Sequence, residues 1–266
     1  MRITGFKGRR ALRKIKFDKA KAAVYIIRGA TVGVLITSAL GGNRENAFTC
    51  LLTLTLTFIP DFVRRRLLVG LPAALELITV LFVFTANILG EIFSFYEKIP
   101  MLDTILHTVN GFVCAGIGLG LVGILNRGRR AGAGLSPAFL VLFSFCFSMT
   151  AGVVWEFFEF GMDYFFGSDM QKDTVVNSIR SYALVGNMGS MAVDNVRDTA
   201  VNGHSLGVNG YLELGLYDTM KDLFVNLIGA LAFDTAGYFY LSGHRKHTRF
   251  IKYLIPEKIG DEQKKA

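Results

Sequence analysis

The sequence is poor in charged residues, proline and cysteine. The few charges argue against a soluble domain, and the few cysteines argue against a cysteine-based metal or redox site. Charged residues occupy 19% of its 266 positions, whereas soluble domains usually carry about a quarter. Five prolines stand against 23 phenylalanines, a bias that suits helices in contact with lipid. The three cysteines, Cys50, Cys114 and Cys146, lie in apolar runs. They form neither a CxxC pair nor a Cys/His metal spacing, so we interpret them as small packing residues.

The formal net charge is +8, which by itself would suit nucleic-acid binding. The basic residues, however, lie between long apolar runs rather than in one patch. This distribution is typical of a membrane protein whose cytoplasmic loops collect Lys and Arg. We therefore expect the lipid bilayer, and no nucleic acid, as a partner.

Six apolar runs are long enough to cross a bilayer, which takes about 20 helical residues. No internal repeat or linker divides the chain. The predicted fold class is therefore all-α, a polytopic membrane helical bundle forming a single integral membrane domain over residues 1–266, with one long outer loop between helices five and six. The six runs cover residues 22–40, 46–63, 72–92, 101–125, 136–160 and 219–241.

The first apolar run follows a basic N-terminal segment, residues 1–21. It exceeds the about 7–15 apolar residues of a cleaved signal peptide, which favours an uncleaved first helix. The alternative is cleavage near Thr37-Ser38-Ala39, which fits a cleavage tripeptide.

Basic residues gather on one side of the six-helix scheme. They occupy the N-terminal segment, the connections after helices two and four, and the tail 242–266. The positive-inside rule then predicts that both termini are cytoplasmic, N-in and C-in. Besides those of the N-terminus, these residues are Arg64, Arg65, Arg66, Arg127, Arg129, Arg130, Arg245, Lys246, Arg249 and Lys252.

The connection between helices five and six, residues 161–218, is unusually long. Connections beyond about 12–15 residues are usually functional or disordered. This one contains Tyr, Leu, Val and Met, together with the turn signals Asn202-Gly203 and Asn209-Gly210. We expect a partly ordered extracytoplasmic loop packed over the outer face.

Acidic and amide side chains recur at the predicted outer ends of the helices. Each set follows three- or four-residue spacing, which places its members on one helical face. Because the orientation comes from Lys and Arg alone, this convergence is an independent observation, and we take it as a candidate polar site of unassigned catalytic role. Its members are Asp103, His107, Glu156, Glu159, Asp218, Asp222 and Asn226.

Each of these residues taken alone also has a structural explanation, because charges at helix ends lie in the headgroup region or near a favourable helix dipole. As a set, carboxylates brought together need protons, a cation or a counter-charge. A divalent cation would suit an oxygen-rich ligand set. The candidate ligands are Asp103, His107, Glu156 and Asp222.

Three further features lie away from this site. Arg28 and Glu76 fall toward the cytoplasmic side and are expected to pair. Asp234 is deeper in the last helix and is a secondary candidate for a proton path. Gly116 and Gly120 form a small-xxx-small pattern that indicates close helix packing.

Three segments carry a resemblance to a known family. They read LDTILH at 102–107, WEFFE at 155–159 and GYLELGLYDTMKD at 210–222, which runs on through Asn226 to Gly229. Together they resemble the YjdF-like family of uncharacterised bacterial membrane proteins and, more distantly, the VanZ-like proteins associated with teicoplanin resistance. The resemblance covers residues 100–235 and implies a bacterial cell membrane. The VanZ-like pattern has Gln a few residues after its Glu, where this chain has Glu159.

The first functional hypothesis is an envelope-related enzyme or lipid-handling protein, whose polar site acts on a lipid-linked substrate at the outer leaflet. No nucleophile stands out, so the sequence does not decide whether it is an enzyme. A proton- or ion-coupled small transporter is the second hypothesis. The third is a membrane scaffold that binds a partner through the outer loop.

Overall fold

The computed structural model describes residues 4–66, 69–126, 134–182, 191–243 and 248–258, with side chains from residue 19 onward. Its contacts divide the chain into two compact units, Met1–Gly152 with Val225–Ala266, and Val153–Phe224. Several basic residues used to predict the orientation lie outside the described residues, namely Arg127, Arg129, Arg130, Arg245 and Lys246.

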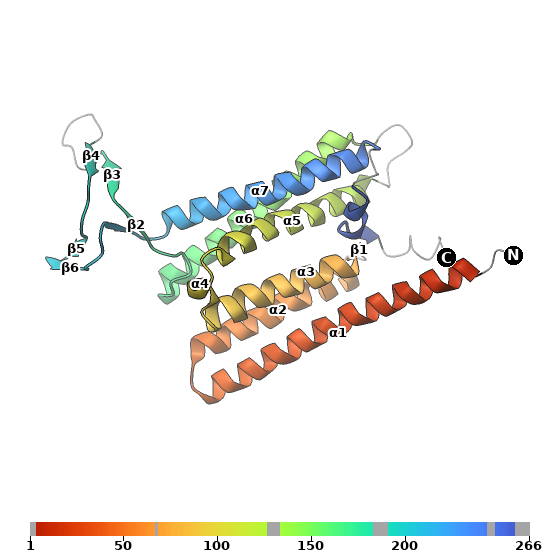
Figure 1. Ribbon diagram of the computed structural model, residues 1–266, viewed down its shortest axis with the longest axis horizontal. Coiled ribbons are helices and arrows are strands. Elements are labelled where there is room, and N and C mark those ends of the chain that lie inside the picture. Colours follow the sequence, from red (N-terminus) through yellow and green to blue (C-terminus); the bar gives the residue numbers. More distant parts are fainter. Residues whose placement is uncertain (1–3, 67–68, 127–133, 183–190, 244–247, 259–266) are drawn as a thin grey trace. The chain divides into compact units, whose positions relative to one another are not determined.

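Six helices in the described part of the chain are long and apolar enough to cross a membrane. They correspond to the six predicted runs, which confirms the polytopic all-α fold (Figure 1). The first contributes Lys19–Leu40 of its length, and the third continues as a π-helix, η1 (Thr85–Ile92). The helices are α1 (Thr4–Leu40), α2 (Arg44–Arg66), α3 (Ala73–Phe84), α5 (Leu102–Asn126), α6 (Pro137–Phe166) and α7 (Leu216–Leu241), with a short α4 (Phe95–Lys98) before α5.

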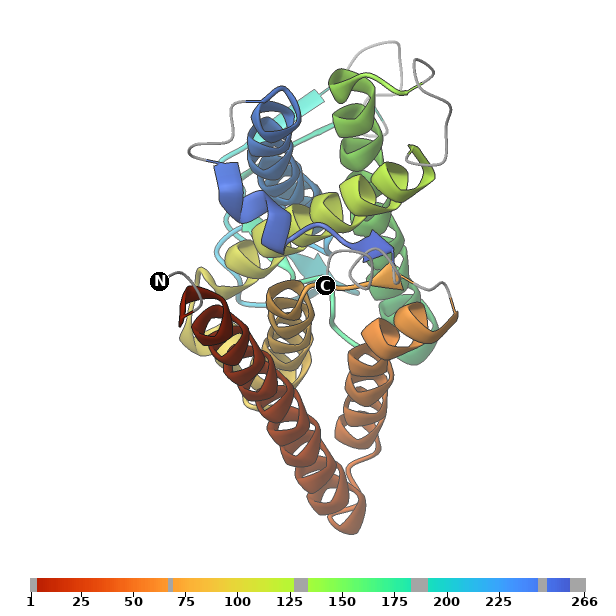
Figure 2. The same ribbon diagram turned by 90° about the vertical axis from the view of Figure 1, so that its right-hand side faces the viewer.

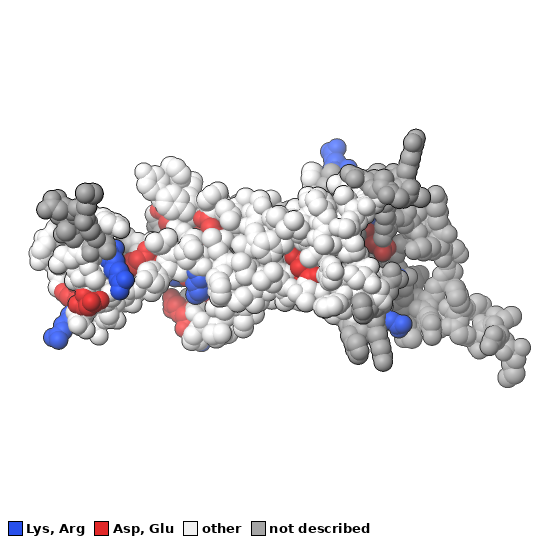
Figure 3. All heavy atoms as spheres, turned by 90° about the horizontal axis from the view of Figure 1, so that it is seen from above, with Lys and Arg blue, Asp and Glu red and all other residues white. Residues whose placement is uncertain are grey.

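The outer surfaces of these helices are apolar, as contact with lipid requires. On the face seen in Figure 3, most of the helical surface carries neither basic nor acidic side chains. Every span exposes large apolar side chains, which would contact water if no lipid surrounded them. Among them are Ile26, Phe62, Leu81, Leu125, Phe157 and Phe224.

In the first unit, α1 and α2 form an antiparallel pair. Gly42 adopts a φ of 72° in the turn, and the Asn43 side chain then caps α2 by accepting a hydrogen bond from the Asn46 N–H at 3.0 Å. The two helices diverge from this turn in a V (Figure 2). Helix α3 contacts both of them and also α5.

The core of the same unit is built by α5, the start of α6 and the end of α7. Phe233 belongs to a buried cluster with Leu119, and Phe112 packs against it edge to face, with ring centroids 5.0 Å apart. Helices α5 and α7 approach most closely where both carry glycine. A Cβ on Gly111 would lie 2.0 Å from the Asn226 carbonyl oxygen, and one on Gly229 would lie 1.9 Å from that of Thr108.

The C-terminal segment packs against the helices instead of forming only a basic tail. It contains η2 (Arg249–Tyr253) and β8 (Glu257–Lys258), which pairs antiparallel with β1 (Val69–Gly70) between α2 and α3. Gly120 makes room for the Pro256 ring, and Gly116 for the Leu254 carbonyl and for Phe233. The small-residue pattern therefore serves mainly this segment, and the prediction that it serves helix packing is wrong for Gly120.

The second unit contains the connection between α6 and α7, folded into short antiparallel ladders. Because α6 reaches Phe166 and α7 begins at Leu216, the connection is shorter than predicted. Asn202 and Gly203 form the predicted turn, both with positive φ (53° and 79°). The ladders pair β2 (Thr174–Val176) with β7 (Tyr211–Glu213), β3 (Ser178–Ser181) with β4 (Met191–Asp194), and β5 (Ala200–Val201) with β6 (His204–Ser205).

Candidate polar site

Four carboxylates of the second unit are buried, two on α6 and two on α7. Glu156 and Glu159 lie one turn apart near the end of α6, and Asp218 and Asp222 lie one turn apart near the start of α7. Their exposed fractions are 4%, 8%, 7% and 1%, respectively. We call these four residues the acidic site.

Glu159 connects the two helices electrostatically. Its carboxylate interacts with the charges of Glu156, Asp222 and Asp218, and it accepts a hydrogen bond from the indole N–H of Trp155 at 2.8 Å. Carboxylates that interact in this way repel one another unless a proton, a cation or a counter-charge lies among them. The acidic site therefore needs at least one of these three to hold four carboxylates together.

Lys221 provides positive charge at the edge of this site. Its Nζ lies 2.9 Å from Asp218 Oδ1 and 3.6 Å from Asp222 Oδ1, although its side chain is nearly half exposed. Lys221 is not among the candidate site residues of the sequence analysis. Its position three residues after Asp218 and next to Asp222 was the signal that could have identified it as their counter-charge.

The polar neighbours of the acidic site hold the connection against the helix ends. Asp218 Oδ2 accepts a hydrogen bond from the backbone N–H of Lys172 at 2.9 Å, and the Gln171 amide donates to the Thr219 hydroxyl at 2.5 Å. Glu213 caps α7 by accepting from the N–H groups of Leu216 and Tyr217, each at 2.9 Å. The start of α7 is thus fixed by the loop before it.

Asp163, which follows the two glutamates on α6, has a structural role. Its carboxylate accepts hydrogen bonds from the Ser168 hydroxyl at 2.9 Å and from the backbone N–H groups of Met170 and Gln171 at 2.6 and 2.8 Å. These contacts organise the chain as it leaves the helix, so this carboxylate is already occupied.

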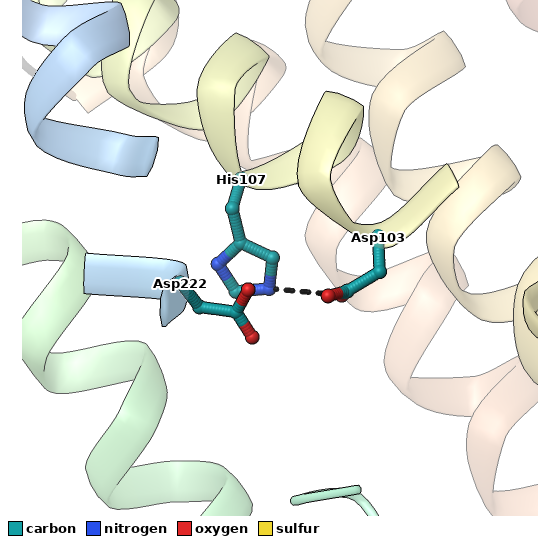
Figure 4. Close-up of side chains that lie close together, drawn as sticks. All are labelled: Asp103, His107 and Asp222. Atoms are coloured by element: carbon teal, nitrogen blue, oxygen red, sulfur yellow. Dashed lines mark ion pairs between the residues drawn. The ribbon is translucent and has the colours of Figure 1, made fainter. Parts of the chain in front are cut away.

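In the first unit, the start of α5 carries Asp103 and His107. His107 Nε2 lies 3.5 Å from Asp103 Oδ1, as the four-residue spacing leads one to expect (Figure 4). Both side chains are partly exposed. An imidazole beside a carboxylate can ligate a metal or exchange a proton.

Asn226 ties together the helices of the first unit. Its Oδ1 accepts from the Asn110 amide at 3.0 Å, and its Nδ2 donates to the Ser148 carbonyl at 3.5 Å. Gly152 leaves the space this amide occupies, since a Cβ there would lie 3.0 Å from Asn226 Nδ2. This predicted site residue therefore has a packing role at the junction of α5, α6 and α7.

The predicted partner of Arg28, which lies on α1, is wrong. Arg28 pairs with Asp61 on α2 at 2.8 Å and donates to the Thr57 carbonyl. Asp61 follows Thr57 by one turn of α2, so both residues face α1, and Asp61 lies against the Arg28 guanidinium. Glu76 lines a small pocket together with Arg28 and Asp61.

Residues 23–243 match the family described as "Predicted membrane protein (DUF2238)". The chain belongs to this family. The match runs from the first span to the end of the last, and it includes every residue of the acidic site as well as Asp103 and His107. For this member of the DUF2238 family, neither the curated proteins nor the solved structures contain a match.

Proposed function

We propose that the acidic site binds a divalent cation, and that this centre serves an envelope-related enzymatic or lipid-handling activity on a lipid-linked substrate at the outer leaflet. The observation that carries the proposal is the burial of four interacting carboxylates on two helices. Hard divalent cations bind carboxylate oxygens. Such a cation could hold a phosphate or carbonyl oxygen of the substrate and polarise it.

We further propose that Asp103 and His107 complete the ligand set with Glu156 and Asp222. Helices α5 and α7 run parallel in the first unit, where Asn110 contacts Asn226 and Leu119 adjoins Gly237. Helix α7 is continuous from Leu216, so Asp222 precedes Asn226 by one turn. His107 likewise precedes Asn110 by one turn on α5, which supports placing the two at the same membrane depth.

The orientation is part of the same proposal. We propose that both termini are cytoplasmic (N-in and C-in) in a bacterial plasma membrane. The arginines at the end of α2 support this orientation, as does the scarcity of basic residues at the helix ends predicted to lie outside. The acidic site then lies on the outer side. The resemblance to YjdF-like and VanZ-like proteins supports an envelope role in bacteria.

The test is the metal content of purified protein, followed by Mn²⁺ titration monitored by electron paramagnetic resonance. Wild-type protein should bind about one cation per chain, and Asp222→Asn and Glu156→Gln should weaken binding at least about tenfold. Asp198→Asn removes an exposed carboxylate of the same unit and is the matched control. Equal Mn²⁺ binding by all four proteins, or none in the wild type, would contradict the proposal.

A second candidate, a proton-coupled transporter, is favoured by Asp234. This residue is buried in α7, and neither carboxylate oxygen has a hydrogen-bond partner among the described residues. Ser144 lies beside it, but its hydroxyl donates to the Ala115 carbonyl at 2.6 Å. An acidic residue at such a depth often marks an ion or proton pathway. Proton flux into proteoliposomes that Asp234→Asn abolishes, with Mn²⁺ binding unchanged, would favour this function over the first.

A further inference from the structure

The carboxylate of Asp234 lies against the apolar core of the first unit. It directly follows Phe233 and lies one turn after Ala230, and both of these residues are fully buried in the core cluster. Asp234 itself is 3% exposed, and neither of its carboxylate oxygens has a hydrogen-bond partner in the part of the chain that the structure describes. An ionised carboxylate without a partner is strongly unfavourable in such surroundings.

No charged side chain among the described residues compensates Asp234. Two influences act on its charge, the apolar surroundings and the side chain of Ser144 on α6. The titratable side chains that α5, α6 and η2 contribute to the first unit are not among these influences. They include Asp103, His107, Cys114, Cys146, Arg249 and Lys252.

Ser144 faces Asp234 as a hydrogen-bond acceptor. A serine hydroxyl has one proton and two lone pairs. The Ser144 hydroxyl, which is fully buried, donates its proton to the Ala115 carbonyl on α5 at 2.6 Å. It therefore offers only lone pairs to the carboxylate, so that two acceptors lie beside each other. A proton on the carboxyl group would turn Asp234 into the donor of this contact.

A proton suits this arrangement better than a metal ion does. Hard cations such as Ca²⁺ and Mg²⁺ take about six or more oxygen ligands, whereas Asp234 and Ser144 supply only their own side-chain oxygens. A proton needs one donor and one acceptor, and it requires no additional space in a closely packed core.

Ser148 is a close structural counterpart of Ser144 that lacks the contact with Asp234. It lies one turn along α6, is also fully buried, and donates to the Gly111 carbonyl on α5 at 2.8 Å. Both hydroxyls thus join α6 to α5 in the same way. Ser144 acts on the Asp234 carboxylate and Ser148 does not. The pair therefore separates helix packing from proton binding.

We propose that Asp234 and Ser144 form a proton-binding site inside the helix bundle, in which the protonated carboxyl group donates to Ser144 Oγ. Binding takes one proton from water and neutralises one negative charge, and release returns the proton and restores the charge. The proposal rests on the second candidate function and deepens it, because it names the ion and the residue that shares it.

The experiment is infrared difference spectroscopy of the full-length protein in lipid vesicles, between alkaline and acidic buffer. A protonated carboxyl group has a C=O stretching band that a carboxylate lacks. Asp234→Asn should remove the part of this band that Asp234 contributes. Ser144→Ala should keep that part but shift it, because the carboxyl group loses its acceptor. Ser148→Ala should leave it at the wild-type position.

Loss of the band in Asp234→Asn, with a shift in Ser144→Ala alone of the two serine variants, supports the proposal. No loss in Asp234→Asn, no shift in Ser144→Ala, or equal shifts in both serine variants overturns it. A band that changes when Na⁺ replaces choline at constant pH also overturns it, because a metal cation would then occupy the site.

Two further measurements separate this proposal from the proposed functions. Proton flux into proteoliposomes tests transport, so the expected band without flux contradicts the transporter and leaves the proton site standing. Mn²⁺ binding by the same variants tests the acidic site by itself. A melting temperature within a few degrees of the wild type confirms that each variant is folded, and the two serine variants keep the test decisive if Asp234→Asn unfolds.

Discussion

At the scale of single residues, a close contact between α5 and α7 in the first unit depends on a missing side chain. Gly111→Ala would place a methyl group 2.0 Å from the Asn226 carbonyl oxygen, a backbone atom. The helices must separate to admit it, at a cost of about 1–3 kcal/mol or more. Gly123→Ala on the same helix meets nothing within 4 Å and should be neutral or slightly stabilising. Thermal unfolding in detergent measures both, and equal melting temperatures would contradict the packing described.

Asp173 gives a prediction that depends on pH. Partial burial, followed by the charges of Asp169, Glu213 and Asp163, raises the pKa of Asp173, although Lys172 opposes them. The unfolded chain then loses this proton at a lower pH than the folded one. Ionised Asp173 therefore costs stability, and this cost appears as the pH rises from the ordinary value through the raised pKa.

Asp173→Asn should consequently raise the melting temperature at neutral pH and have little effect near about pH 3.5, below the ordinary pKa. Unfolding at the two pH values, measured on the wild type and the variant, checks the sign. Asp198→Asn is the control for a general effect of removing an exposed charge. A variant that stabilises the protein equally at both pH values would show that titration of Asp173 is not the cause.

At the scale of an element, the C-terminal segment places the side chain of Ile251 inside the core. Ile251 in η2 is fully buried in the cluster of Ala115, Leu119 and Phe233, whereas its neighbour Phe250 is 45% exposed. Ile251→Ala should destabilise the protein by about 2–5 kcal/mol, and Phe250→Ala should have little effect. Chemical unfolding of the two variants makes the comparison. A larger loss for Phe250→Ala would mean that the segment does not pack as described.

At the scale of the whole molecule, the proposed orientation can be tested by labelling. In a chain whose three cysteines are replaced by alanine, Ser205→Cys in the β5–β6 turn region and Lys258→Cys in β8 are both exposed. With the proposed topology, a membrane-impermeant maleimide labels the first in intact cells and the second only after permeabilisation. The reverse pattern would place the acidic site on the cytoplasmic side.

The spans could be predicted from the sequence, whereas several partners could not. Length and hydropathy decide whether a helix crosses a bilayer, so all six runs were recognised. Which face of a helix meets which neighbour depends on rotation and crossing, which a single sequence leaves open. For this reason Arg28 was assigned to Glu76 rather than Asp61, and the role of Gly120 toward Pro256 was missed.

The candidate site was predictable to a similar degree. Three- and four-residue spacing correctly indicates that Glu156 and Glu159 share a face, as do Asp218 and Asp222. The same patterns could not distinguish Asn226, which holds three helices together. Cation binding itself stays a prediction for the metal analysis.

The antiparallel pairing of β8 with β1 has a consequence for the order of biosynthesis. The ribosome makes Ile251, Pro256 and β8 after all six spans, yet Ile251 and Pro256 pack against α5 and β8 pairs with β1, the strand that connects α2 to α3 in the chain. Membrane insertion of the helices can therefore finish before the packing among them is complete. A nascent chain stalled just after α7 would be fully integrated and still lack part of its core, and it should be an early substrate for membrane proteases.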